Sequence, residues 1–117
     1  MRIPSELWVK AYVRQRSATG LGAFIVKRGD DRGGAIWIKV ARLDGTASLY
    51  GPAMAGMIEA ASERRFEARR VDQPEREIDD LLTAERRFDD DIWIVEIEDR
   101  QGRHGLGDDL IEPEIKR

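Results

Sequence analysis

The chain has no cysteine, only one histidine and no long hydrophobic run. Without cysteine it can form no disulfide, thiolate nucleophile, cysteine-ligated zinc site or iron–sulfur cluster. One histidine excludes a His-rich metal site within a single chain, and no run approaches the roughly 20 apolar residues of a membrane span. We therefore predict no metal, no cofactor and no membrane contact. The start, Met1-Arg2-Ile3-Pro4, reaches polar residues too soon for a signal peptide, which predicts a cytoplasmic protein.

The length of 117 residues fits one domain. We place this domain at residues 1–107, followed by an acidic tail at residues 108–117 that we expect to fray. The net charge of −3 conceals an asymmetry, because residues 1–70 hold 13 Lys/Arg and 7 Asp/Glu (net +6) whereas residues 71–117 hold 7 and 16 (net −9). We expect the two halves to interleave in space and neutralise each other, rather than to form a basic face and an acidic face.

The first element is predicted as a helix within residues 5–19. Ser5 suits the N-cap position and Gly20 suits the stop. Apolar residues recur at helical spacing, at Leu7, Trp8, Ala11 and Tyr12. A strand stays open as the alternative, because apolar residues also alternate, at Leu7, Val9, Ala11 and Val13.

Three strands are predicted next. Residues 22–27 and 35–43 are β-rich and flank a glycine-rich stretch at residues 29–34. Asp44-Gly45 is typical of a two-residue type I′ turn, which needs positive φ at both positions, and residues 46–50 return as the third strand. Because the connections are short, we expect an antiparallel three-stranded meander.

Residues 51–74 give the least distinct pattern. Residues 53–61 could form a short helix, and residues 64–71 a strand or an exposed basic loop. Pro74 then suits the first turn of a helix. The face of this helix is predicted to carry Ile78, Leu81, Leu82, Glu85 and Phe88. Acidic residues at its start and basic residues at its end match the helix dipole.

The stretch from Asp91 to Asp99 reads as a buried strand, followed by a turn at Gly102 and a short return strand over Arg103–Leu106. Together the elements predict an α+β domain with two main helices. Its sheet is expected to be mostly antiparallel, a three-stranded meander plus a C-terminal strand or hairpin.

The strand at residues 92–98 carries the main candidate site. Trp93, Val95 and Ile97 point to one face, and Ile92, Ile94, Glu96 and Glu98 to the other. Two carboxylates about 6.5–7 Å apart can divide acid and base roles. His104 is the only side chain that titrates near neutrality, so a hydrolase-like site of Glu96, Glu98 and His104 is one hypothesis. The simpler interpretation is a salt-bridged half-face, with Lys39 as a suitable partner because it lies mid-strand among apolar residues.

A second candidate is the basic set Arg64, Arg65, Arg69 and Arg70 around Phe66. Such residues could follow a phosphate backbone and stack on a base. Glu63 and Glu67 weaken the positive field, so a solvated basic segment is the simpler interpretation.

Several blocks resemble a mainly alphaproteobacterial family, the domain of unknown function 1491. The similar segments are Leu7-Trp8-Val9-Lys10-Ala11-Tyr12-Val13-Arg14, Val26-Lys27-Arg28-Gly29-Asp30, Ile38-Lys39-Val40, Leu43-Asp44-Gly45-Thr46, Arg87-Phe88-Asp89, Ile97-Glu98-Asp99-Arg100 and Gly102-Arg103-His104. Residues 53–63 look like a departure from the family. The resemblance implies a single-domain bacterial protein and brings no activity with it.

The leading functional hypothesis is a small cytoplasmic interaction or ligand-binding module. Its polar patch would contain Arg28, Lys39, Glu96, Glu98 and His104, with Arg100 as a further binding candidate. The partner would be another protein or a second copy of the chain. The first alternative is a nucleic-acid-associated protein using the basic segment at 64–70. The second is the hydrolase-like enzyme.

Overall fold

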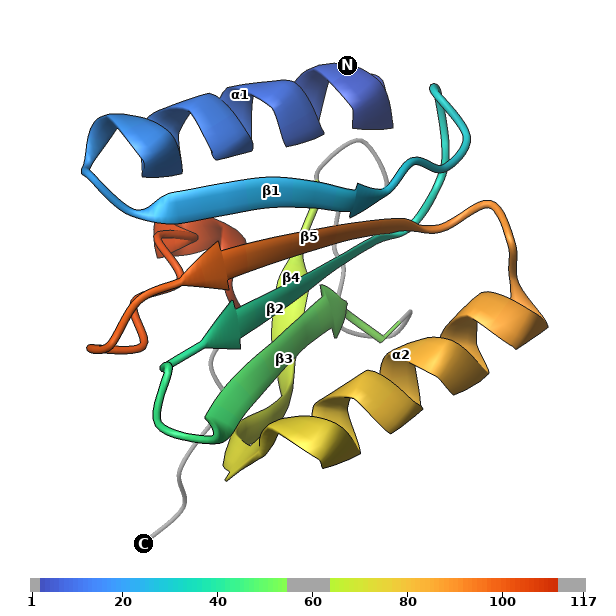
Figure 1. The fold of residues 1–117 in the computed structure, drawn as a ribbon. Coiled ribbons are helices and arrows are strands. Elements are labelled where there is room, and N and C mark those ends of the chain that lie inside the picture. Colours follow the sequence, from blue (N-terminus) through green and yellow to red (C-terminus); the bar gives the residue numbers. More distant parts are fainter. Residues whose placement is uncertain (1–2, 55–63, 112–117) are drawn as a thin grey trace, which may run out of the picture.

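The computed structural model describes residues 3–54 and 64–111. Along the chain the elements are α1 (Ser5–Ala18), β1 (Gly22–Lys27), β2 (Ile36–Ala41), β3 (Thr46–Pro52), β4 (Phe66–Pro74), α2 (Glu75–Phe88), β5 (Trp93–Glu98) and the short 3-10 helix η2 (Gly107–Asp109). The five strands form one mixed sheet, and the two helices pack on its opposite faces (Figure 1). The predicted α+β class and both main helices are confirmed. The helix suggested at residues 53–61 falls largely outside the described residues.

The order of the strands corrects the predicted meander. The sheet runs β1-β5-β2-β3-β4, so β5 lies between β1 and β2, antiparallel to the first and parallel to the second. Only the antiparallel hairpin of β2 and β3 is as predicted. The physical reason is burial: β5 is apolar on both faces over Ile92–Val95, and a strand covered on both faces belongs in the middle of a sheet. Residues 64–71, left open between strand and loop, belong largely to β4.

The loop between β1 and β2 packs against the loop that enters β5. Asp30 donates its backbone N–H to the carbonyl oxygen of Asp91 at 2.9 Å. A Cβ placed on Gly29 would lie 2.2 Å from the same oxygen, so this approach requires glycine. The eight residues from Arg28 to Ala35 therefore pass across the start of β5 instead of forming a tight hairpin.

The turn between β2 and β3 differs from the predicted type I′ turn. Positive φ occurs at Leu43 (64°) and Gly45 (91°), not at Asp44. The Asp44 carboxylate accepts hydrogen bonds from the backbone N–H and the hydroxyl of Thr46, at 2.9 and 2.6 Å. Since Arg42 donates its N–H to the Thr46 carbonyl, the loop has three residues, and the local side-chain bonds of Asp44 stabilise it.

The predicted return strand over Arg103–Leu106 is wrong. The chain instead turns beneath the α1 face, forms η2 and makes an isolated parallel bridge between Leu110 and Phe66 of β4. Leu106 is buried and Leu110 packs beside it, because this half of the sheet face has no helix of its own to cover it. Of the predicted tail, residues 108–111 are thus ordered against the core, and residues 112–117 lie outside the described part of the chain.

Ser5 is not the N-cap of α1 as predicted. Pro4 holds that position, and Ser5 begins the helix fully buried. Its hydroxyl donates to the carbonyl oxygen of Gly34 at 2.7 Å, which ties the start of α1 to the β1–β2 loop. The buried face of the helix is centred on Val9 and Tyr12, whereas Leu7 is 58% exposed.

The core has two halves divided by the sheet. The half beneath α1 is built on the largest fully buried side chain, Trp93, together with the alternate β5 residues Val95 and Ile97, as the alternation predicts. The half beneath α2 is smaller and is closed by Ile78 and Leu82 of the helix. Phe88, expected on the same helix face, is 90% exposed, because it ends the helix where the chain leaves the sheet.

The basic and acidic halves of the sequence interleave, as expected. The acidic-half strand β5 lies between β1 and β2 of the basic half. Ion pairs join the two halves at Lys39–Glu75, Lys39–Asp79, Lys39–Glu96, Arg42–Asp72, Arg65–Asp109, Arg70–Glu77 and Lys27–Asp90. The sequence asymmetry therefore does not become one basic face and one acidic face.

Candidate functional site

The two faces of the sheet are covered unequally. On one face, α1 packs on β1 and β5, and the segment with Leu106 and Leu110 packs beside it. On the other face, α2 packs on β3 and β4. This leaves the β1 and β5 half of the second face open, with Phe24 49% and Val26 57% exposed. We call this surface the open face and define it by Phe24 and Val26 of β1 with Ile94, Glu96 and Glu98 of β5.

A buried lysine lies at the border between the open face and α2. Lys39 of β2 is 5% exposed, and its Nζ is surrounded by three carboxylates. The distances from Nζ are 2.7 Å to Glu75 Oε2, 2.7 Å to Asp79 Oδ1 and 3.4 Å to Glu96 Oε1. The predicted pairing of Lys39 with a strand glutamate is confirmed for Glu96. We call these four residues the Lys39 cluster.

The Lys39 cluster fixes the charge of its lysine. Burial alone lowers the pKa of the Lys39 amine, but the hydrogen bonds to Asp79 and Glu75 and the charge of Glu96 outweigh it. The net effect raises the pKa of Lys39 above its ordinary value. Because the amine stays protonated, it can act neither as a general base nor as a nucleophile. The cluster therefore keeps the Lys39 amine charged and fixes the positions of the three carboxylates around it. It carries one positive and three negative charges.

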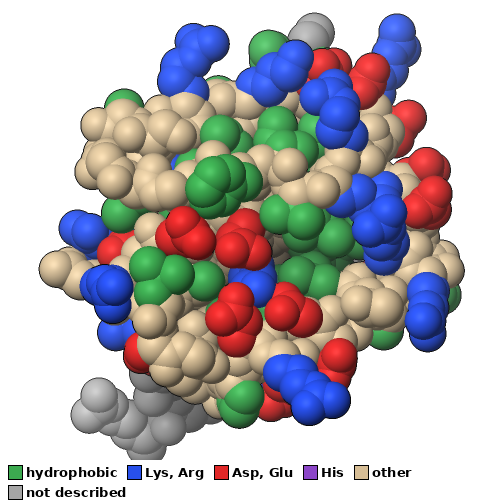
Figure 2. Space-filling model, in the orientation of Figure 1, with side chains coloured by type: hydrophobic (Ala, Val, Ile, Leu, Met, Phe, Trp, Pro, Cys, Tyr) green, Lys and Arg blue, Asp and Glu red, His purple; other side chains and the backbone are tan. Residues whose placement is uncertain are grey.

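A groove runs beside the Lys39 cluster, between α2 and the open face. It has a volume of about 190 Å³. Its lining combines apolar side chains with acidic and basic ones: Val26, Lys39, Asp79, Leu82, Thr83, Arg86, Ile94 and Glu96. Figure 2 shows this side of the molecule, with acidic side chains gathered around one basic side chain and hydrophobic side chains next to them. An apolar floor with an acidic wall can accept a ligand that has both an aliphatic and a cationic part.

His104 lies on the other side of the sheet from Glu96 and Glu98. Its ring packs against Tyr50, whose side chain belongs to the core half beneath α1, with ring centroids 4.9 Å apart. The Nδ1 atom accepts the backbone N–H of Leu106 at 2.9 Å, and the His104 carbonyl oxygen accepts the hydroxyl of Tyr12 at 2.5 Å. The histidine thus supports the turn into η2, and the sheet separates it from both glutamates.

The other two predicted binding residues do not join the Lys39 cluster. Arg28 forms an ion pair with Glu6 of α1 at 3.0 Å and lies 5.1 Å above the Trp93 ring. Arg100 is exposed in the turn after β5. Of the predicted patch, the structure therefore brings together Lys39 and Glu96, with Glu98 two residues along the same strand.

The four arginines of the nucleic-acid hypothesis are divided between different surroundings. Arg64 is 9% exposed and donates to the carbonyl oxygen of Ile3, and Arg65 lies 3.6 Å from Asp109. Arg69 donates to the Pro52 carbonyl, pairs with Glu67 at 3.3 Å and lies over the Trp37 ring. Arg70 pairs with Glu77 at 3.8 Å. The four arginines do not form one continuous basic surface, because carboxylates and carbonyl oxygens of the same chain already bind their guanidinium groups.

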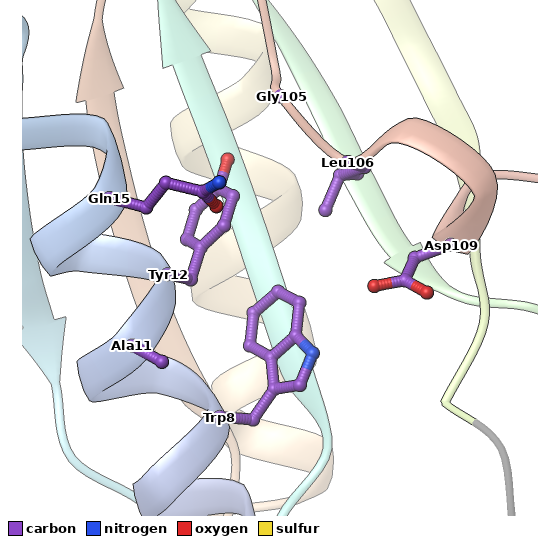
Figure 3. A pocket seen from close by; sticks show the side chains of 7 residues that line it. All are labelled: Trp8, Ala11, Tyr12, Gln15, Gly105, Leu106 and Asp109. Atoms are coloured by element: carbon purple, nitrogen blue, oxygen red, sulfur yellow. The ribbon is translucent and has the colours of Figure 1, made fainter. Parts of the chain in front are cut away.

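A second hollow lies between α1 and the segment around η2 (Figure 3). It has a volume of about 280 Å³, and Trp8 and Tyr12 of α1 face Leu106 and Asp109 across it. The Trp8 ring is stacked on Tyr12 and packs at a tilt against Phe66, with both centroid distances 5.0 Å, so it already contacts two other rings. Asp109 is engaged by Arg65. This hollow therefore offers fewer unused groups than the groove beside the Lys39 cluster.

Asp99 is a buried carboxylate that was predicted only as part of the turn after the strand and not as a site residue. It is 4% exposed and organises the turn after β5. It accepts hydrogen bonds from the side chain of Arg103 (2.7 Å to Nε) and from the backbone N–H groups of Gln101 and Arg103 (3.0 Å each). The Arg103 side chain, followed by the backbone donors, outweighs burial and lowers the pKa of Asp99 to about 2.

The pKa of Asp99 predicts a loss of stability in acid. A carboxylate with a lowered folded pKa stabilises the fold above its unfolded pKa, near 3.8, and this contribution disappears as pH falls toward about 2. We expect Asp99→Asn to lower the free energy of unfolding by about 2 kcal/mol at pH 7, and the difference from wild type to vanish by about pH 2. Urea denaturation at several pH values measures both. Asp108→Asn, an exposed change nearby, should have no effect, and an equally stable Asp99→Asn variant would contradict the assignment.

The fold and the site define a small α+β domain with helices on both faces of a mixed sheet and one half of a face left open. The chain belongs to the family described as protein of unknown function (DUF1491), whose match spans residues 3–107. The resemblance drawn from the sequence blocks is thereby confirmed.

Three solved structures of similar proteins support the membership. A protein from A. tumefaciens is 42% identical, with a TM-score of 0.73 and coverage of 84% of this chain and 86% of that one. A crystal structure of a DUF1491 family protein from Caulobacter crescentus CB15 is 34% identical, with a TM-score of 0.79 and coverage of 96% and 100%. An NMR structure of a DUF1491 family protein from the same organism is 35% identical, with a TM-score of 0.79 and coverage of 96% and 99%. No curated protein matches the chain.

Neither a cluster of metal ligands nor a membrane-spanning helix occurs in the part of the chain that the structure describes. Residues 3–54 and 64–111 hold no group of three or more His, Cys, Asp or Glu side chains arranged to bind a metal. Within the same ranges, no helix has the length and apolarity needed to cross a membrane.

Proposed function

We propose that the protein is a small interaction module of the cytoplasm that binds a polypeptide segment of a partner protein on its open face. The observation that carries the proposal is the unequal cover of the sheet: α2 protects β3 and β4 and leaves Phe24 and Val26 of β1 half exposed. Large apolar side chains gathered on an uncovered sheet face, rimmed by charged groups, are typical of protein interaction sites.

The chemistry of the site favours binding over catalysis. The buried amine of Lys39 is held protonated by its three carboxylates, so it cannot exchange protons with a substrate near neutral pH. His104 lies across the sheet from Glu96, so the pair cannot share a substrate on the open face. A charged and partly apolar surface whose lysine is held by carboxylates, and which His104 does not reach, supports recognition of a partner.

Site-specific photo-crosslinking in living bacteria tests the proposal. A photoreactive phenylalanine analogue at position 26 should give a discrete adduct with another protein. The same analogue at position 88 should give none, because Phe88 is 90% exposed but lies outside the open face. The partner is then purified and its affinity for the full chain is measured directly.

The double variant Phe24→Ser, Val26→Ser should lower the affinity for this purified partner by about tenfold or more, since apolar residues at the centre of an interface contribute most of its energy. Phe88→Ser is the matched control and should bind as wild type. Both variants change exposed side chains, so circular dichroism should show unchanged folds. Equal binding by the double variant and the control would overturn the proposal.

A further inference from the structure

The groove beside the open face carries a net negative charge, and this charge indicates the chemistry of the partner. We infer that the bound segment is basic and apolar, with Lys or Arg side chains next to aliphatic ones; this inference rests on the proposed interaction function. Three features of the groove support a basic and apolar segment: its net charge, the accessibility of its carboxylates and the apolar side chains beside them.

The groove and its rim carry more acidic than basic groups. The charged side chains are Glu75, Asp79, Glu96 and Glu98 against Lys39 and Arg86, which is four negative and two positive charges, a net of −2. Lys27, opposite Ile94, is paired with Asp90 and leaves this balance unchanged. The ammonium of Lys39 cannot reach a ligand, because its side chain is 6% exposed and lies among the carboxylates. An anionic segment would meet like charges here, which disfavours it, and a cationic segment is attracted.

The carboxylates keep the capacity to bind a second cation. The side chains of Asp79 and Glu75 are 55% and 37% exposed, although each holds Lys39 with one oxygen at 2.7 Å. An ionised carboxylate can accept about four hydrogen bonds, so each has unused acceptor sites that point toward solvent. Glu98 forms no ion pair among the residues that the structure describes, and it lies opposite Gly22, which has no side chain to cover it.

The apolar part of the site lies directly beside the acidic part. Phe24 of β1 is the cross-strand neighbour of Glu96 on β5, so the two side chains share one face of the sheet. Val26 then lines the groove together with Leu82 and Ile94. A segment that places an aliphatic side chain on Phe24 and Val26 brings its neighbouring Lys or Arg to Glu96, Glu98 or Asp79. One bound segment can therefore make the apolar contact and the ionic contact at the same time.

A titration of the full chain, labelled with nitrogen-15, by three synthetic peptides tests the inference. The probes are a basic–aliphatic hexapeptide (Lys-Val-Arg-Val-Lys-Val), its acidic counterpart (Glu-Val-Asp-Val-Glu-Val) and a basic–polar version (Lys-Ser-Arg-Ser-Lys-Ser), all with blocked ends. We expect the first to shift the amide signals of Gly22–Lys27, Ile94–Glu98 and Asp79–Arg86, with an affinity that falls as salt is raised. The acidic peptide should leave these signals unchanged, and the basic–polar peptide should bind more weakly.

Variants that replace carboxylates by amides test whether the peptide binds at the groove. Asp79→Asn with Glu98→Gln should weaken binding of the basic–aliphatic peptide by about threefold to tenfold, the range expected from losing two partly exposed ion pairs. The matched control is Asp31→Asn with Asp80→Asn, which removes the same charge at exposed positions outside the groove and should bind as wild type. Circular dichroism confirms that both variants are folded.

The outcomes separate this inference from the proposed function. Equal binding of the acidic and basic–aliphatic peptides at the open face would overturn the basic character of the partner and leave the interaction module standing. Equal binding of the basic–polar and basic–aliphatic peptides would overturn the apolar requirement. Peptide-induced shifts confined to β4 or α1 would overturn the inference and the proposed site together.

Discussion

Replacing Lys39 by methionine should lower the free energy of unfolding at pH 7 by about 2–3 kcal/mol. Methionine keeps the apolar stem in place and removes the charge, so Glu75, Asp79 and Glu96 lose the cation that they share. Breaking a buried ion pair on one side costs about 3–5 kcal/mol. Here Asp79 is 55% and Glu75 37% exposed, so water stabilises part of the uncompensated charge and the expected loss is smaller.

The pH dependence of this variant gives the sharper test. Without Lys39 the negative charges of Glu75, Asp79 and Glu96 repel one another in the folded protein. This repulsion destabilises the fold near neutral pH and weakens as acid neutralises carboxylates. The deficit of Lys39→Met relative to wild type should therefore shrink as pH falls from about 7 to about 4.

Two further variants support the measurement by urea denaturation. Adding Glu96→Gln to Lys39→Met should recover about 1 kcal/mol, because one repelling charge is removed. Lys10→Met is the control, since Lys10 pairs with Glu6 on the surface with a side chain 53% exposed, and it should change stability by less than about 0.5 kcal/mol. A Lys39→Met variant as stable as the Lys10→Met control would show that the cluster contributes nothing to the fold.

Replacing Trp93 by alanine should have the largest effect on stability, a loss of about 4 kcal/mol. Trp93 is fully buried, and truncating a buried tryptophan costs about 3–5 kcal/mol through lost contacts and the cavity that it leaves. The indole also donates its N–H to the carbonyl oxygen of Asp30 at 2.8 Å, and Arg28 lies over the ring at 5.1 Å. Since small domains are stable by only about 5–15 kcal/mol, this loss removes a large part of the stability.

Trp93→Phe separates the hydrogen bond from the volume of the ring. It keeps most of the apolar contact but leaves the Asp30 carbonyl without the indole donor, so we expect a loss of about 2 kcal/mol. Phe88→Ala, at a position 90% exposed, should change stability by less than about 0.5 kcal/mol. Thermal unfolding ranks the three variants, and a Trp93→Ala protein with a melting temperature near wild type would contradict the core described here.

Local patterns predicted most of the elements, but not the order of the strands. The helical period and the charge order identified α2, alternation identified β2 and β5, and the turn at Asp44-Gly45 indicated β3. The meander followed from the rule that neighbours in sequence tend to pair, which β1 breaks. Two features of the sequence argue against a meander. The run at Ile92–Val95 is apolar on both faces, which is typical of a central strand with a parallel neighbour. The connection at residues 28–35 is long for a hairpin.

Only the part of the candidate site that lies on single strands could be predicted from the sequence. Alternation placed Glu96 and Glu98 on one face and suggested Lys39 as a partner. Glu75 and Asp79 can bind Lys39 only because of the place where α2 crosses the sheet. The spacing of residues in the sequence does not predict that place. The acidic start of α2 was instead explained by its dipole. His104 and the glutamates are close in sequence but lie across the sheet from each other, because the chain turns beneath the α1 face after Asp99.

The most direct test of the open face as a docking surface is a map of backbone amide signals when the partner captured at position 26 is added to the wild-type chain. We expect the shifted signals to belong to Gly22–Lys27 of β1, Ile94–Glu98 of β5 and the groove side of α2 around Asp79–Arg86. Signals that shift only in β4 or α1, with those of β1 and β5 unchanged, would contradict it.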